Sequence, residues 1–254
     1  FPFFKRQALV RGIIVPSRFQ NTAKSYSSVW SSKGGPLLQH SYLLKEALQK
    51  KMPQVIIEIA MRYQKPSIAK ALESLKKQNL DEIIVLPLYP HYSSACNGSV
   101  IEKVMEEIKL WDCFPRITFA STFFDHPLFI EALAKRATQR DLNNFDHILF
   151  SFHGLPERQI KKVNSGFCLG KKDCCSRQVE ENKFCYRSQC VQTANLVAKH
   201  LSLPKEKYTI CFQSRLGKEK WLPPYTSEVL KEKSKTDKKI LVFCPSFVCD
   251  CLET

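Results

Sequence analysis

The chain has 254 residues, of which 44% are hydrophobic and 25% are charged, so it can bury the core of one large or two smaller domains without disulfide bonds. It contains no apolar run of about 18 residues, which argues against a membrane-spanning helix. Its N-terminus lacks the order of basic, apolar and small residues typical of a signal peptide. We therefore expect a cytoplasmic protein.

The net charge of +15 would suit nucleic acid, an anionic membrane surface or an acidic small molecule as a partner. No nucleic-acid-binding motif accompanies the charge, so we expect no nucleic-acid partner. Anionic headgroups attract such a surface, and a peripheral contact with a membrane therefore stays open.

Apolar runs that predict strands alternate along the chain with segments of helical spacing. The expected strands are 54–60, 82–86, 117–120, 147–152, 208–212 and 239–243, and the expected helices are 67–78, 100–110, 128–140 and 189–201. This alternation is typical of βαβ units and parallel sheets, so the sequence predicts an α/β fold. A boundary between two α/β halves is expected near 112–120.

Polar and turn-forming residues follow four of the expected strands, at 87–93, 153–156, 213–217 and 244–247. Parallel sheets bind ligands beyond the carboxyl ends of their strands. If these strands are neighbours, the four segments converge on one cleft. His153 leads one of the segments, and a histidine in that position can act as a base or a metal ligand, although such a residue is more commonly structural.

Four ordered segments resemble those of the ferrochelatases, which insert ferrous iron into a porphyrin. These segments are LPLYPHYS at 86–93, SFHGLPER at 151–158, FQSRLGKEKWLPPYT at 212–226 and PSFVCDCLET at 245–254. The resemblance implies two similar Rossmann-like domains with parallel sheets and a cleft between them. We place the domains at 1–118 and 119–254, the second with a cysteine-rich insert at 164–190.

The resemblance also implies roles for single residues. His153 is expected to accept protons and contact the metal, with Glu253 as its carboxylate partner. Pyrrole N–H protons must be removed by a base, and imidazole and carboxylate groups are suitable ligands for ferrous iron. The expected porphyrin contacts, including an arginine for a propionate, are Arg18, Arg62, Tyr63, Tyr89, Tyr92 and Ser93.

The sequence departs from the family pattern in several places. No apolar strand precedes Phe1, and the family continues beyond the block that closes at Thr254, so we expect both ends to be missing. Whether such a chain is active stays open. His91 stands where relatives commonly have glutamine, Gly35 where serine is common, and Cys251 where several have histidine.

Five of the eleven cysteines fall between Cys168 and Cys190, and in a chain without a secretion signal such clustering favours metal ligation. Five thiols can supply four ligands to a [2Fe–2S] cluster or a structural Zn²⁺ ion, or they can be free or redox-active. Some bacterial ferrochelatases resemble this chain in carrying an internal cysteine-rich insert with a [2Fe–2S] cluster. The ligands are then expected to be Cys168, Cys175, Cys185 and Cys190, with Cys174 as a replacement for Cys175.

The leading function is therefore that of a lyase of heme biosynthesis, with ferrous iron and either protoporphyrin IX or coproporphyrin III as substrates. A related chelatase for cobalt or nickel is one alternative, and a non-catalytic heme or iron–sulfur binding protein is another. The choice of porphyrin, the oligomeric state and the role of the cluster cannot be derived from the residues.

Overall fold

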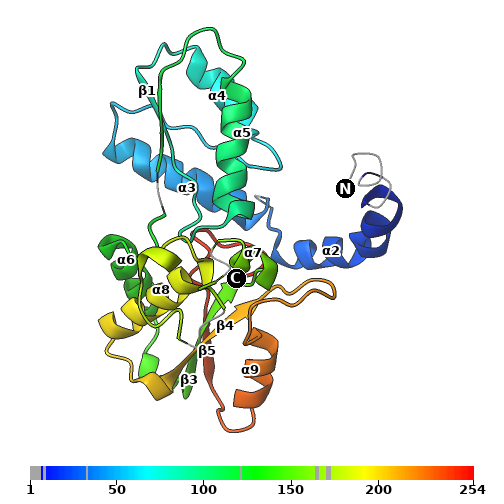
Figure 1. The fold of residues 1–254 in the computed structure, drawn as a ribbon, viewed down its shortest axis with the longest axis vertical. Coiled ribbons are helices and arrows are strands. Elements are labelled where there is room, and N and C mark those ends of the chain that lie inside the picture. Colours follow the sequence, from blue (N-terminus) through cyan, green and yellow to red (C-terminus); the bar gives the residue numbers. More distant parts are fainter. Residues whose placement is uncertain (1–6, 8–9, 33, 121, 164–165, 170–172) are drawn as a thin grey trace. The chain divides into compact units, whose positions relative to one another are not determined.

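A computed structural model describes the chain except residues 1–6, 8–9, 33, 121, 164–165 and 170–172, and for Ile13, Ile14, Ser17, Arg18 and Asn21 it describes the backbone alone. The architecture is mixed α/β with small parallel sheets, as the sequence predicts (Figure 1). The chain divides into two compact units. The first unit consists of residues 1–59 and 249–254, and the second of residues 60–248.

The first unit is helical in the part that the structure describes. Its elements are η1 (Val10–Ile14), α2 (Val15–Val29) and α3 (Pro36–Lys51). Helix α3 begins at Pro36, where a missing N–H costs nothing. Gly35 precedes it, and a Cβ atom there would lie 3.0 Å from the ring of Trp30. Any larger side chain at this position would therefore have to shift that ring.

The prediction of a strand at 54–60 is wrong, because the structure forms no strand there. Val55 and Ile56 are exposed, and the amide of Val55 donates to the carbonyl of Met52 in a turn. A strand needs a hydrogen-bonded neighbour. No strand pairs with this segment among the residues that the structure describes.

The second unit holds all the described strands, in two parallel sheets. The strands are β1 (Glu82–Val85), β2 (Arg116–Phe119), β3 (His147–His153), β4 (Tyr208–Gln213) and β5 (Ile240–Phe243). One sheet pairs β1 with β2, and the other has the order β4-β3-β5 (Figure 1). The carboxyl ends of β3, β4 and β5 therefore share one edge.

Helices and short helical turns connect these strands. They are α4 (Ile68–Lys76), η2 (Ser94–Gly98), α5 (Ser99–Ile108), α6 (Pro127–Ala137), η3 (Leu142–Asn144), α7 (Glu157–Lys161), η4 (Glu180–Asn182), α8 (Tyr186–His200), η5 (Lys205–Lys207) and α9 (Thr226–Lys233). Ser67 caps α4, because its side chain accepts from the amide of Lys70. No helix among the described residues combines the length and apolar character needed to cross a membrane.

The smaller sheet packs against α4 and α5. Ile83 of β1 is buried with Ile68 and Leu72 of α4 and with Val104 and Ile108 of α5. In each helix the two buried residues are four apart, which places them on one face. This packing explains why the sequence pattern predicts both helices.

The larger sheet is covered on both faces. Alternate residues of a strand point to opposite faces, and β3 shows this clearly. Ile148, Phe150 and Phe152 belong to the core that includes residues of α6 and α8, whereas Leu149 packs with Val229 of α9. Strand β3 is buried from His147 through Phe152, so the residue at its end is carried by a rigid element.

Candidate functional site

His153 is the last residue of β3 and is half-buried. Its Nδ1 atom lies 2.7 Å from the carbonyl oxygen of Gly154. A carbonyl oxygen only accepts, so Nδ1 carries the proton and Nε2 of the neutral ring presents a lone pair. The ring lies between aromatic side chains, with centroids 6.4 Å from Trp221 and 6.2 Å from Phe247. An imidazole with a lone pair on Nε2 can accept a proton or bind a metal ion.

Gly154 allows the chain to leave β3 beside β4. Its amide donates to the carbonyl of Gln213 at 2.8 Å. A Cβ atom at this position would lie 2.8 Å from the same carbonyl oxygen and 3.3 Å from the ring of Trp221. Glycine is therefore required here by the close approach of the backbone.

Two side chains from other elements bind the main chain of His153. Its carbonyl accepts from the hydroxyl of Tyr186 at 2.7 Å, and its amide donates to Ser246 Oγ at 3.4 Å. Tyr186 opens α8, and Ser246 follows β5. Neither residue was expected from the sequence. Ser246 stands in the block 245–254 and Tyr186 in the cysteine-rich insert, but neither motif indicates a contact with His153, which only the tertiary fold creates.

The segment after β1 reaches α8 within the second unit. The amide of Tyr92 donates to Gln189 Oε1 at 2.6 Å, and its ring lies 5.4 Å from that of Phe184. Ser93 is buried and caps η2 by accepting from the amide of Ala95. Ser93 is one of the residues expected to contact the porphyrin, and in the structure it also stabilises the start of η2.

Arg62, Tyr63 and Tyr89 lie together in the second unit. The Arg62 guanidinium stacks 4.7 Å from the centroid of the Tyr63 ring, and its Nε donates to the carbonyl of Ser99 at 2.9 Å. Burial raises the pKa of Tyr89, and the nearby Cys96 and Tyr63 act in the same direction while the charge of Arg62 opposes them. The structure thus brings three of the expected pocket residues together. The side chain of Arg18 lies outside the described residues.

Glu253 belongs to the first unit and His153 to the second, so each is placed only within its own unit. The thiol of Cys251 donates to Glu253 Oε2 at 3.0 Å. Burial, followed by this bond, raises the pKa of Cys251 to about 12. The segment is anchored to α3, where Asp250 lies 3.7 Å from His40.

The five clustered cysteines are all buried. The thiol of Cys185 interacts by hydrogen bonding with those of Cys175 and Cys168, and together with two backbone amides this lowers its pKa to about 6 despite burial. Burial and the neighbouring Cys185 raise the pKa of Cys168 to about 12. Cys174 Sγ lies 3.7 Å from Cys175 Sγ.

The side chain of Asn182 forms hydrogen bonds with the backbone of the cysteine-rich segment. It is fully buried, it accepts from the amide of Val179, and it donates to the carbonyls of Cys174 and Arg177. Within the described part of the chain, no group of three or more His, Cys, Asp or Glu side chains has the arrangement of a metal site. The five thiols are nevertheless buried and interact with one another, and thiols are the donors that an iron–sulfur cluster or a structural zinc ion requires.

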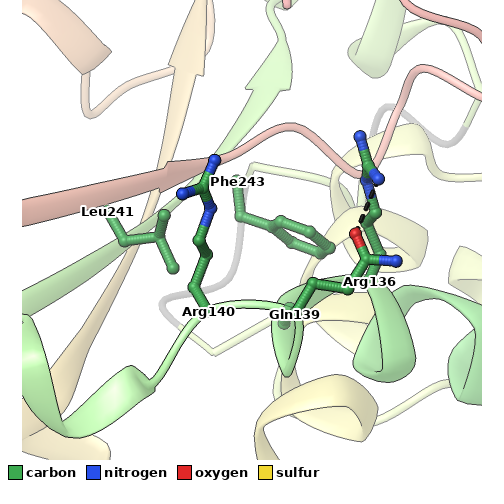
Figure 2. Close-up of a pocket in the computed structure, with 6 residues that line it drawn as sticks. Arg136, Gln139, Arg140, Leu241 and Phe243 are labelled. Carbon is green, nitrogen blue, oxygen red and sulfur yellow. Dashed lines mark hydrogen bonds between the residues drawn. The ribbon is translucent and has the colours of Figure 1, made fainter.

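A small surface pocket lies away from these residues, where the end of α6 meets β5. Its volume is about 190 Å³. Figure 2 shows Arg136 and Arg140 beside Leu241 and Phe243, with Arg136 donating to Gln139 at 2.7 Å. None of the residues expected to act in the site lines this pocket.

Comparison with known proteins gives a uniform result. The family model described as ferrochelatase matches residues 1–254. The ferrochelatase of Legionella pneumophila (strain Paris) is 44% identical over 255 residues, which span the whole of this chain and 76% of that protein. The ferrochelatase of Coxiella burnetii (strain Dugway 5J108-111) is 39% identical over 258 residues, spanning the whole chain and 72% of that protein.

Proposed function

Because the chain belongs to the ferrochelatase family, and its function is accordingly the insertion of ferrous iron into a porphyrin in the terminal step of heme biosynthesis, we propose that His153 is the base of this reaction. The supporting observation is the contact between Nδ1 and the Gly154 carbonyl, which leaves the Nε2 lone pair to accept a pyrrole proton. Imidazole is also a suitable ligand for ferrous iron.

An insertion assay with Fe²⁺ tests the role of His153. Replacing a general base typically costs about 10²–10⁴ in rate, so His153→Ala should lower kcat by about that factor. His200→Ala, at the exposed end of α8, is the control and should keep the wild-type rate. An unchanged rate in His153→Ala would refute the role.

We also propose Glu253 as the carboxylate partner of His153. A carboxylate supplies the oxygen ligand that ferrous iron accepts. Glu253→Gln keeps the size of the side chain and removes its charge, so the KM for Fe²⁺ should rise and kcat should fall. A variant with unchanged constants for Fe²⁺ would exclude Glu253 from the reaction.

The porphyrin contacts are proposed at Arg62, Tyr63, Tyr89, Tyr92 and Ser93, together with Arg18. Tyr63 is 78% exposed, so its ring can contact a planar macrocycle, and the adjacent Arg62 can pair with a propionate. Arg62→Ala should raise the KM for porphyrin with little change in that for Fe²⁺. Comparing kcat/KM for protoporphyrin IX and coproporphyrin III would establish which one is the substrate.

A [2Fe–2S] cluster is proposed at Cys168, Cys175, Cys185 and Cys190. The donor chemistry fits, because these thiols are buried and Cys185 has the lowered pKa of a thiolate ligand. When bound, such a cluster carries one electron reversibly. The purified protein should contain iron and acid-labile sulfide and absorb in the visible range. Stoichiometric zinc without sulfide would indicate the structural Zn²⁺ alternative.

The choice between Cys174 and Cys175 can be settled by mutation. Cys175 interacts with Cys185 by hydrogen bonding, which supports it as the ligand. Cys175→Ser should lose sulfide, whereas Cys174→Ser should retain it. The reverse pattern would assign the ligand to Cys174.

The domain arrangement is proposed as two similar Rossmann-like domains, 1–118 and 119–254, with a cleft between them. One parallel sheet in 82–119 and a second in 147–243 support this division. We further propose a cytoplasmic enzyme with a peripheral membrane contact, and the net charge of +15 supports the contact with anionic headgroups. If the protein sediments with anionic vesicles but not with neutral ones, the membrane contact is supported. If equal amounts of the protein stay in the supernatant with both kinds of vesicle, the contact is refuted.

A further inference from the structure

Three side-chain and main-chain contacts form a closed ring of hydrogen bonds around His153. The amide of His153 lies 3.4 Å from Ser246 Oγ, the Ser246 hydroxyl lies 3.2 Å from the Tyr186 hydroxyl, and the Tyr186 hydroxyl lies 2.7 Å from the carbonyl of His153. Both polar groups of the His153 main chain are therefore bound in one ring. Its members come from the end of β3, the start of α8 and the loop after β5.

The proton positions in the ring follow from donor chemistry. The Tyr186 hydroxyl has a single proton, which goes to the carbonyl of His153, because a carbonyl cannot donate. Ser246 accepts from the amide of His153 and donates its own proton to the Tyr186 oxygen. Each bond orients the next, so removing one hydroxyl breaks the ring and releases the His153 main chain.

Tyr186 also lies among the clustered cysteines. Cys185 is the N-cap of α8 directly before it, and Cys190 lies one turn later on the same helix. The thiol of Cys190 interacts by hydrogen bonding with the Tyr186 hydroxyl. Tyr186 is only 7% exposed, and its ring meets that of His91 edge-on at 5.9 Å. One buried hydroxyl therefore contacts both His153 and a proposed cluster ligand.

We propose that Tyr186 is a positioning residue for His153. This inference rests on the proposed role of His153 as the base. The Tyr186 hydroxyl binds the His153 carbonyl directly, and through Ser246 it is linked to the His153 amide. The main chain that carries the imidazole is thereby fixed at the end of β3.

The positioning role is tested with Tyr186→Phe, which removes only the hydroxyl. A small displacement of a reacting group has a large effect on rate, so kcat should fall about tenfold while the KM values for porphyrin and Fe²⁺ stay within about twofold. The matched control is Tyr208→Phe, because Tyr208 is also buried and its hydroxyl donates to Asn195. The control should lose stability without losing kcat.

The ring predicts a second result. Ser246→Ala breaks the same ring, so it should lower kcat by a similar factor. Combining it with Tyr186→Phe should cause no further loss, because the two hydroxyls act as one unit. Additive losses, or a Tyr186→Phe enzyme with wild-type kcat, would overturn the positioning role.

Discussion

The Nε2 atom of His91 lies 2.9 Å from the hydroxyl of Thr193, and both side chains are buried. Thr193 donates its own proton to the carbonyl of Phe124 at 2.6 Å, so Nε2 must donate to Thr193. Nδ1 is then an acceptor, and it has no partner among the described residues. Burial lowers the pKa of His91 to about 3 from 6.5, so this ring is held neutral at the junction between the segment after β1 and α8.

His91 should make the protein sensitive to acid. Above pH 6.5 the ring is neutral in both the folded and the unfolded chain, and its contribution to stability is fully present. Below pH 6.5 only the unfolded chain takes up a proton, so the free energy of unfolding falls by about 1.4 kcal/mol per pH unit until the folded ring also titrates near pH 3. Urea unfolding at pH 7.5 and 5.0 measures this loss.

The control for that experiment is His91→Gln, which retains a polar side chain without a titrating group. The wild type should lose about 2 kcal/mol more than the variant between the two pH values. Equal losses would mean that the His91 ring takes up its proton as readily in the folded protein as in the unfolded chain.

Gly154→Ala should impair both stability and catalysis. The added Cβ would meet the carbonyl of Gln213 at 2.8 Å, and such overpacking costs about 1–3 kcal/mol. Because the backbone must move, His153 should shift and kcat should fall. Gly166→Ala is the control, since a Cβ there meets nothing within 4 Å. Thermal unfolding and the insertion assay measure the two effects, and identical behaviour of the two variants would contradict the steric argument.

Gln189→Met should weaken porphyrin binding. Gln189 is almost fully buried, accepts from the amide of Tyr92 and donates to the carbonyl of Lys183. Methionine leaves the two backbone groups without their partner, at a cost of about 1–3 kcal/mol each when they stay buried. Fluorescence titration with porphyrin should show a higher Kd for Gln189→Met and no change for the exposed Gln139→Met. Wild-type affinity in Gln189→Met would separate Tyr92 from the porphyrin site.

Asn182→Ala should reduce cluster content. The side chain of Asn182 makes three bonds to the backbone around the clustered cysteines, and its removal should free that segment. Iron and sulfide per chain should fall together with the unfolding temperature. Asn144→Ala, which removes an exposed bond to Asp141, should leave all three unchanged. Full sulfide content in Asn182→Ala would show that the thiols hold the segment without it.

The strands and helices that the sequence predicts correctly share a simple physical cause. Helix α4 has a serine cap and a regular apolar face, and β3 is a mostly apolar run, interrupted by Ser151, that becomes the centre of a sheet. The segment 54–60 has the same strand-like composition, but pairing depends on a neighbouring strand, which composition does not encode. Helix α8 begins three residues before the predicted start at Gln189, because a cysteine rather than a usual capping residue precedes it.

The site was predictable only where a motif surrounds a residue. His153 and Gly154 stand in a recognisable block at a strand end, and the structure gives each a geometric reason. Tyr186 has no such signal, and the block 245–254 that contains Ser246 does not indicate that this serine binds the main chain of His153. The two residues lie 33 and 93 positions away in the chain from the carbonyl and amide that they bind, so only the folded chain reveals these contacts.

The burial of β3 between two strands has a consequence for how the enzyme fails. The amide protons of a central strand exchange with solvent only when the surrounding structure opens as a whole. The amides from Ile148 to Phe152 should therefore be among the slowest in the second unit, since these residues are fully covered. The imidazole at the end of this strand should then keep its position until the surrounding structure unfolds. Heat inactivation should therefore coincide with global melting rather than precede it.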